Sequence, residues 1–395
     1  MQYDFTTVLN RFGTGSTKWE EMKKYGITDS SIVPLSNAEM EFDNAPEIKQ
    51  GLIDYIGKAV LSYFDPQPDY FETVKAWFER RYNFCFDVSA VVPNPSIHAA
   101  LCTAIMAYSN EGDGILVMQP TWPGFLGSVR NTGRKIIDHE LVEQDCVYSI
   151  DFERLEAQLS APECKMILLC SPHNPVGRCW TKDELTTIGE LCVKHDVIIV
   201  SDEIHADLTM PGYRHYPIAT LSPEIAARTV TFTGASKAFN LAGLDTSNVI
   251  ITDEALRTKF RQARRKEGFS DPNMIGLKAL ELAYTKGESW LRECVDVIAE
   301  NARYVTEFLR EEIPQVRCTR LEATYLMWLD FRQLGLDEKE LEKGLMEDAH
   351  LFMDDGYYFG VGGSRFVRMN IACPKAVLVT AMGRMRDWVR SLPKE

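Results

Sequence analysis

Short runs of apolar residues recur through the first two thirds of the chain, and each is followed by a polar turn and a helical pattern. Four of these runs have the length of a strand: residues 115–118, 166–170, 197–201 and 230–233. Amphipathic stretches lie between them, and in one of these Thr181 and Glu184 have the spacing of a helical capping box. Continuous apolar strands that alternate with helices predict a parallel sheet covered on both faces, and so an α/β fold.

The pattern changes near residue 274. A long helical stretch over 275–311 is followed by a strand at 324–330, a helix near 337–348, a glycine-rich segment at 356–363, a strand at 366–371 and a last helix. This order predicts a smaller α+β domain. The first 45 residues have no strong period, and we expect them to wrap onto that domain. The predicted division is a large domain over 46–282 and a small domain made of 1–45 and 283–395.

Composition narrows the class of protein. The 395 residues are 45% hydrophobic, which is enough apolar mass for a folded core, and the net charge is −14. An acidic chain is a poor partner for nucleic acids or anionic membranes. No apolar run approaches the ~20 residues of a membrane helix, and the first eleven residues have no apolar region of the kind a secretory signal needs, so we expect no such signal. The ten cysteines form no C-x-x-C pair, so we expect free thiols and a cytoplasmic protein.

Polar residues follow each of the four predicted strands. In an open α/β sheet, ligands bind beyond the carboxyl ends of the strands, so these residues should converge on one crevice. They are Trp122, Asn174, Asp202, His205, Ser236 and Lys237.

Two of these residues suggest a particular chemistry. Burial at a strand end would lower the pKa of the Lys237 amine and make it a nucleophile for imine formation; taken alone, it would more often be a surface lysine. Asp202 ends an apolar strand and needs a cationic partner, such as the ring nitrogen of pyridoxal phosphate. A magnesium ligand of an NTPase is the competing interpretation of Asp202. It requires a P-loop, and the nearest match, around Gly57 and Lys58, has the wrong spacing.

Other candidates remain ambiguous when each is taken alone. Asn174 lies between two prolines and either donates to a cofactor oxygen or simply makes a turn. Trp122 either stacks on an aromatic ring or packs in the core. Ser96 and Ile97 open a helical stretch, which is either an anion site or a plain helix cap. Arg368 lies among apolar neighbours and binds either a substrate carboxylate or an internal acid. The histidines show no metal-binding spacing, so we predict no metal.

Three segments carry a family resemblance. They are 171–178 (SPHNPVGR), 201–207 (SDEIHAD) and 236–244 (SKAFNLAGL), and with them nearly the whole chain resembles the fold-type-I, pyridoxal-phosphate-dependent class I/II aminotransferase superfamily. Within that superfamily the chain most resembles the cystathionine β-lyase, or C–S lyase, branch, because its second segment contains His205. The resemblance implies the fold of aspartate aminotransferase, pyridoxal 5'-phosphate as the cofactor and an amino acid as the substrate.

The resemblance also implies roles for the cofactor-binding residues. Lys237 would carry the cofactor and move the substrate's α-proton, and Asp202 would pair with the ring nitrogen. Asn174 would hold the phenolic oxygen, with His205 also beside the cofactor. Trp122 takes the place of a ring-stacking tyrosine in the family.

The phosphate and the substrate have their own expected partners. Ser96, Ile97 and Ser236 would cradle the phosphate, and Arg368 would bind the substrate carboxylate. Tyr63 matches a tyrosine that reaches the phosphate of the neighbouring subunit, which implies a homodimer with shared active sites.

One segment departs from the family pattern beside the expected substrate. Ser36 and Asn37 replace a tryptophan and a valine, so that small polar groups take the place of bulky apolar ones. We therefore expect cystathionine or a related cysteine S-conjugate with a polar or acidic tail. The leading hypothesis is a C–S β-lyase that releases thiol, pyruvate and ammonia. An aminotransferase of a small amino acid is the first alternative, and a non-catalytic regulatory protein is the second.

Overall fold

The computed structural model describes residues 2–29, 32–268 and 271–393. Its main sheet has seven strands in the order β1-β9-β8-β7-β6-β2-β3. The strands β2, β3, β6, β7 and β8 run parallel, whereas β9 is antiparallel to both β8 and β1. Their bounds are β1 Val91–Asn94, β2 Gly114–Gln119, β3 Lys135–Glu140, β6 Cys164–Cys170, β7 Ile198–Asp202, β8 Thr229–Thr233 and β9 Ser247–Ile250. The four predicted apolar runs all form strands, and the predicted α/β fold is confirmed.

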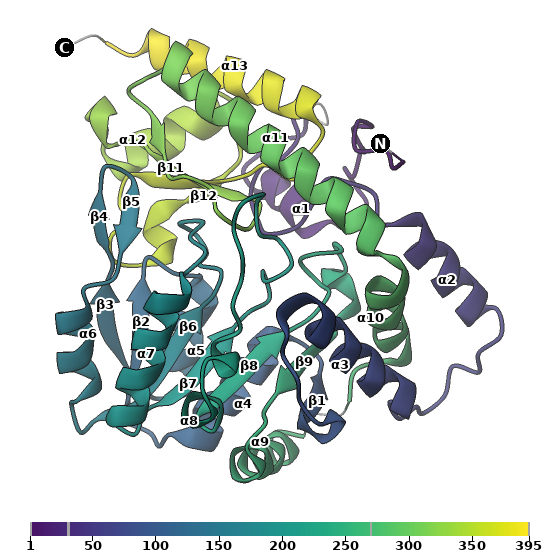
Figure 1. Ribbon diagram of the computed structural model, residues 1–395. Coiled ribbons are helices and arrows are strands. Elements are labelled where there is room, and N and C mark those ends of the chain that lie inside the picture. Colours follow the sequence, from purple (N-terminus) through teal and green to yellow (C-terminus); the bar gives the residue numbers. More distant parts are fainter. Residues whose placement is uncertain (1, 30–31, 269–270, 394–395) are drawn as a thin grey trace.

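Helices cover both faces of this sheet (Figure 1). One face packs against α4 (Ile97–Tyr108), α5 (Pro123–Asn131) and α9 (Glu254–Lys266), and the other against α6 (Phe152–Leu159), α7 (Lys182–Lys194) and α8 (Pro223–Ala226). The sheet is buried from both sides, which explains why its strands are apolar without alternation. Both hydrogen bonds of the capping box at Thr181 and Glu184 form, as predicted.

The smaller domain is built on a four-stranded antiparallel sheet in the order β10-β11-β13-β12. The strands are β10 Arg317–Cys318, β11 Leu326–Asp330, β12 Asp354–Asp355 and β13 Phe366–Asn370. Helices α11 (Glu288–Glu312) and α13 (Lys375–Ser391) lie side by side over this sheet at the top of Figure 1. Helix α12 (Glu338–Lys343) continues as a π-helical turn to Asp348.

The remaining elements lie at the edges of the two domains. They are α1 (Thr17–Lys24), α2 (Pro46–Ile56), α3 (Pro68–Tyr82), α10 (Met274–Lys286) and the small hairpin of β4 (Val142–Gln144) and β5 (Val147–Ser149). Helix α10 packs against α2 and α3. Among the described residues, no helix is both long enough and apolar enough to cross a membrane.

The prediction of one long helix over 275–311 is wrong, because the chain forms α10 and α11 with a break at Gly287. A Cβ atom at Gly287 would lie 2.6 Å from Cε1 of Phe239 and 2.7 Å from the carbonyl oxygen of Ala283. The ring of Phe239 fills this space and stacks on Trp290 of α11, with ring centroids 6.3 Å apart. Because Gly287 has no side chain, Phe239 in the segment that follows β8 can pack between α10 and α11.

Residues 35–42, which we call the N-terminal strap, join the two domains. On the small-domain side, the backbone N–H of Asn370 donates to the Leu35 carbonyl at 2.8 Å. On the large-domain side, Oδ1 of Asn240 accepts from the backbone N–H of Met40 at 2.9 Å, and Nδ2 donates to the Met40 carbonyl at 3.0 Å. Asn240 has a φ of 55°, a left-handed conformation that asparagine tolerates better than most residues. The strap contacts both the smaller antiparallel sheet and the segment that follows β8.

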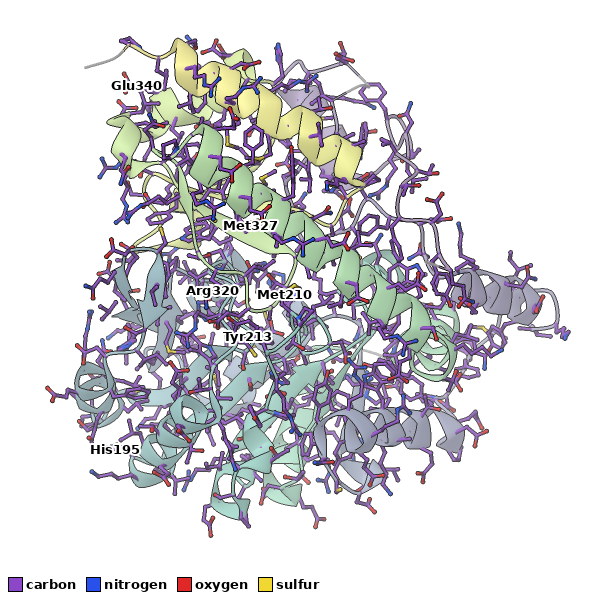
Figure 2. The ribbon with its side chains drawn as sticks, turned by 45° about the horizontal axis from the view of Figure 1, so that its top comes forward. His195, Met210, Tyr213, Arg320, Met327 and Glu340 are labelled. Carbon is purple, nitrogen blue, oxygen red and sulfur yellow. The ribbon has the colours of Figure 1, made fainter. Side chains whose placement is uncertain are left out.

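A second contact between the domains involves the loop after β7 and the segment before β11. Figure 2 shows Met210 and Tyr213 on this loop near Arg320. The backbone N–H of Met210 donates to the Glu322 carbonyl at 2.9 Å, and this hydrogen bond joins the loop to the segment before β11.

Candidate active site

A cavity of about 360 Å³ lies at the carboxyl ends of the parallel strands, next to the N-terminal strap and β13. Ten of the twelve predicted site residues line it. They are Asn37, Ser96, Ile97, Trp122, Asn174, Asp202, His205, Ser236, Lys237 and Arg368. Residues from four strand ends, one helix start and the strap therefore meet in a single active-site cavity, as the strand-end rule predicts.

Lys237 lies in the turn that follows β8. Its Nζ donates to the carbonyl oxygen of Ala38 in the strap at 2.8 Å. The two residues that follow Lys237, Ala238 and Phe239, are completely buried, which fixes the position of the turn. Burial, together with the positive charge of Arg368, lowers the pKa of the Lys237 amine to about 8. A larger share of this amine is therefore uncharged, and nucleophilic, near neutral pH than in an ordinary lysine.

Asp202 is the last residue of β7 and only 5% exposed. Its Oδ1 accepts a hydrogen bond from the backbone N–H of Ile204 at 3.1 Å. Burial raises the pKa of the carboxyl to about 7, although the Ile204 bond and the charge of Lys237 favour the ionised form. A buried carboxylate at the floor of a cavity is stabilised by a cation placed beside it.

Arg368 has the most fully bonded side chain in the cavity. Its Nη1 donates to Oδ1 of Asn174 at 3.0 Å, and its Nε and Nη2 both donate to Oδ2 of Asp354 at 3.0 and 2.7 Å. The ion pair forms because Asp354 in β12 lies opposite Arg368 in the register with β13. Arg368 therefore forms an ion pair with Asp354 inside the protein, and its side chain still lines the cavity. Oδ1 of Asn174 accepts from Arg368, and the amide nitrogen of Asn174 is the donor that it can offer to a cofactor.

The ring of Trp122 stands at the start of α5, where it packs edge-to-face against His98 with ring centroids 5.9 Å apart. A Cβ atom on Gly124 would lie 2.3 Å from this ring, so the absence of a side chain at Gly124 permits its position. His98 also lines the cavity, although sequence reasoning did not select it. Its place two residues after Ser96, in the first turn of a helix that starts at a strand end, was the available signal.

The predicted anion site lies at the N-terminus of α4. Ser96 caps this helix, and its Oγ accepts from the backbone N–H of Ala99 at 3.2 Å. The first backbone N–H groups of a helix have no partner within the helix and carry partial positive charge, which suits a phosphate. Ser236, Thr246 and Ser247 also line the cavity and add polar groups.

His205 is buried, and its Nδ1 has no hydrogen-bond partner among the described residues. Burial and the charges of Lys237 and Arg368 lower the pKa of the ring to about 3, so the imidazole is neutral. Its ring packs edge-to-face on Tyr325.

Two predicted residues lie outside the active-site cavity. Ser36 is 2% exposed and lines a second cavity that shares a wall with the first. Tyr63 is fully exposed on the surface of the chain and does not line the active-site cavity. Asp354, which sequence reasoning missed, joins the site through Arg368.

These residues fit pyridoxal 5'-phosphate. The cavity offers an amine of lowered pKa for the aldehyde, a buried carboxyl for the ring nitrogen and an amide donor for the phenolic oxygen. A helix N-terminus is available for the phosphate, and a neutral imidazole with an unpaired nitrogen lies beside them. Within the part of the chain that the structure describes, no cluster of His, Cys, Asp or Glu could hold a metal ion.

Comparisons with known proteins agree with this site. Residues 30–384 match the family model for aminotransferase class I and II. Cystathionine beta-lyase PatB of Bacillus subtilis is 36% identical over 377 residues, which cover 95% of this chain and 97% of that protein. Protein MalY of Escherichia coli is 30% identical over 393 residues, which cover 99% and 100% of the two chains.

Solved structures give the same result. The crystal structure of cystalysin from Treponema denticola, which contains pyridoxal 5'-phosphate, has a TM-score of 0.98 and 38% identity, and both chains are fully covered. A C–S lyase from Staphylococcus hominis bound to the same cofactor has a TM-score of 0.92 and 27% identity, with 98% of each chain covered. The chain belongs to the aminotransferase class I and II family, as its resemblance predicted, and is an enzyme of the kind that uses pyridoxal 5'-phosphate.

Proposed function

We propose that the protein is a C–S β-lyase that acts on cystathionine or a related cysteine S-conjugate. The reaction consumes one water and releases a thiol, pyruvate and ammonia. The observation that carries the proposal is the convergence of Lys237, Asp202 and Arg368 with His205 on one cavity. The names of PatB and of the S. hominis enzyme support the lyase over other reactions of the family.

Each residue has a distinct task in this proposal. The guanidinium of Arg368 binds the substrate carboxylate and so fixes the position of Cα. The Lys237 amine, whose lowered pKa favours its free-base form, removes the proton from Cα. The cofactor, when bound, supplies an electron-withdrawing ring that accommodates the charge left at Cα. The C–S bond then breaks with its electron pair leaving on sulfur, and Nζ of Lys237 returns the proton to that sulfur.

Asp202 and Asn174 act on the cofactor rather than on the substrate. The Asp202 carboxylate would hold a proton on the ring nitrogen, and Nδ2 of Asn174 would donate to the phenolic oxygen. The backbone amides at Ser96 and Ile97, with Ser236, would bind the phosphate. Trp122 would stack on the ring.

A homodimer is part of the proposal. The end of α2 and the segment that links it to α3 expose the apolar residues Ile53, Ile56, Val60, Leu61 and Tyr63. Contiguous exposed apolar residues favour a protein–protein contact, and a second copy of the chain would bring Tyr63 to the partner's phosphate site. Light scattering should show a dimer, and Tyr63→Phe should weaken cofactor retention about ten-fold, through loss of a hydrogen bond to a charged group. A fully active monomer would contradict this assignment.

The domain division and the location belong to the same proposal. Helix α10 packs against α2 and α3, whereas α11 packs against α13 and β10, which supports a boundary near residue 283. All ten cysteines are free thiols, which supports a reducing, cytoplasmic setting.

The decisive experiment separates elimination from amino transfer. The purified holoenzyme is incubated with cystathionine, S-methyl-L-cysteine, alanine and aspartate, and thiol, pyruvate and pyridoxamine phosphate are measured separately. We expect thiol and pyruvate in equal amounts from the cysteine derivatives and neither product from Lys237→Ala. If no cysteine derivative gives pyruvate while pyridoxamine phosphate accumulates with a simple amino acid, the protein is an aminotransferase.

A further inference from the structure

A second cavity, of about 320 Å³, opens beside the active-site cavity. Asn37, Trp122 and Arg368 line both cavities and form the boundary between them. A substrate whose carboxylate lies on Arg368 therefore has this second cavity within reach of its side chain. We call it the acidic annex, after the four carboxylates among its lining residues: Glu21, Glu342, Asp354 and Asp355.

Negative charge dominates the acidic annex. Its carboxylates come from three separate elements: α1 carries Glu21, α12 carries Glu342, and β12 carries Asp354 and Asp355. Arg368 is the single basic residue among the described residues that line the annex, and its charge is already paired with Asp354. Lys343, the basic residue next to Glu342 in the chain, is exposed and pairs with Glu347 instead.

The carboxylates other than Asp354 have no cation of their own. Within the described residues, no ion pair involves Glu21, Glu342 or Asp355, and Glu342 accepts only a weak hydrogen bond from Tyr357 at 3.4 Å. Burial and the negative charges of Glu342, Asp354 and Glu338 raise the pKa of Asp355 to about 7. The charges therefore repel one another in the free protein, and a bound cation would relieve this repulsion.

A second, independent feature also points to a polar ligand. Ser36 lines the annex and is 2% exposed, yet its Oγ has no hydrogen-bond partner among the described residues. A buried hydroxyl without a partner is costly, and most such groups bind water or a ligand. The other walls, which include Leu345, Phe352 and Met353, are apolar and suit a chain of methylene groups.

We propose that the acidic annex binds the cationic end of the substrate side chain, and that the preferred substrates are cysteine S-conjugates with a distal ammonium group. This inference rests on the proposed lyase function. The ammonium would donate to Oγ of Ser36 and to the carboxylates of Glu342 and Asp355, with the methylenes against the apolar walls. A distal carboxylate would meet these same acids without a free basic partner. The annex therefore favours a cationic tail over the acidic tail that was expected from the sequence.

Binding tests the annex independently of turnover. L-Lysine and L-2-aminoheptanoate have side chains of equal length, and they differ only in a terminal ammonium or methyl group. Calorimetric titration of the holoenzyme should show L-lysine binding at least ten-fold more tightly. Glu342→Gln and Asp355→Asn should each reduce this preference to three-fold or less. Glu190→Gln, which removes an exposed carboxylate on α7, is the matched control and should preserve it.

Turnover provides the second measurement. S-(2-aminoethyl)-L-cysteine and S-propyl-L-cysteine are the corresponding pair with a sulfur leaving group, and pyruvate release gives kcat/KM for each. We expect the aminoethyl compound to be favoured ten-fold or more. Equal values for the two compounds, together with equal binding of the two amino acids, would overturn the annex even if pyruvate forms. If neither compound gives pyruvate but L-lysine still binds selectively, the annex stands and the proposed lyase function fails. The wild-type comparison needs no variant, so it holds even if a substitution prevents folding.

Discussion

Arg368 and Asp354 lie opposite each other on neighbouring strands, and one oxygen of Asp354, Oδ2, accepts hydrogen bonds from both Nε and Nη2 of the guanidinium. The same carboxylate accepts the backbone N–H of Asn37 at 3.0 Å and so links the strap to β12. The edge formed by Nε and Nη2 is thereby fixed, and Nη1, which donates to Asn174, is the guanidinium nitrogen that makes no bond to Asp354. Asp354 is therefore a positioning residue.

Asp354→Asn should impair substrate binding more than chemistry. The amide oxygen can still accept hydrogen bonds but carries no charge, so the guanidinium is held less firmly in its orientation. We expect KM for a cysteine conjugate to rise about ten-fold, equivalent to about 1.4 kcal/mol, with kcat changed less than three-fold. Steady-state kinetics over a wide range of substrate concentrations checks this. An equal fall in kcat with unchanged KM would show that Asp354 acts on the chemical step.

The lowered pKa of Lys237 predicts how cofactor attachment depends on pH. Because only the uncharged amine attacks an aldehyde, the fraction of reactive Lys237 rises about ten-fold per pH unit below pH 8 and levels off above it. Apoenzyme mixed with pyridoxal phosphate and reduced with borohydride should show this profile in the peptide that contains Lys237. Labelling that keeps rising to pH 10, as for an ordinary exposed lysine, would contradict the lowered pKa.

Asp202→Asn should separate cofactor binding from catalysis. An amide cannot keep the ring nitrogen protonated by charge, although it preserves the shape of the pocket. Loss of a charge pair in a buried site is worth several kcal/mol at the transition state, so turnover should fall about 10³-fold. Cofactor content, measured from the visible absorption of the purified protein, should remain above half. A variant that keeps near-normal kcat would remove Asp202 from this role.

Asp355 predicts a pH-dependent loss of stability. Its pKa is raised in the folded state to about 7 from an ordinary value of 3.8, so the folded protein favours the protonated carboxyl. The stability contributed by this group is fully present below about pH 4 and is lost as the pH rises through 7. Asp355→Asn should therefore raise Tm at pH 8, by roughly 2–4 °C, and have little effect near pH 4. Thermal unfolding at the two pH values measures this; a variant less stable at pH 8 would contradict it.

The position of Trp122 can be tested through the glycine beneath its ring. Gly124→Ala places a methyl group 2.3 Å from the indole, so the ring must move away from the cofactor position. We expect cofactor affinity to fall about ten-fold in equilibrium dialysis. Gly127→Ala on the same helix is the matched control, since no atom lies within 4 Å of its added methyl group. Equal behaviour of the two variants would mean that Trp122 does not stack on the cofactor.

The elements with the strongest local signal were the most predictable from sequence. The continuous apolar runs ending at Cys170 and Asp202 identified the strands, and the cap at Ser96 identified the start of α4. The end of a strand fixes where the next few residues lie, and for this reason Lys237 and Asn174 could be predicted as site residues. The topology of a parallel sheet brings its strand ends together whatever their separation along the chain.

Long-range pairing explains what was missed. Asp354 joins the site only through the register of a two-residue strand with β13, and nothing local marks β12 as a strand. The break at Gly287 arises because Phe239 packs there, and helical periodicity runs through this glycine without interruption. The acidic annex combines residues from α1, the strap, α12 and β12, so its net charge becomes visible only when these segments are assembled.

The contact between Phe239 and Gly287 has a consequence for engineering. Phe239 is two residues from Lys237, and its ring is lodged at the junction where α10 of the large domain gives way to α11 of the small one. A larger side chain at position 287 would displace this ring, and with it the turn that presents the reactive amine. A designer who alters the helix junction at Gly287 should therefore also measure the reactivity of Lys237, because one buried ring contacts the junction and lies two residues from the amine.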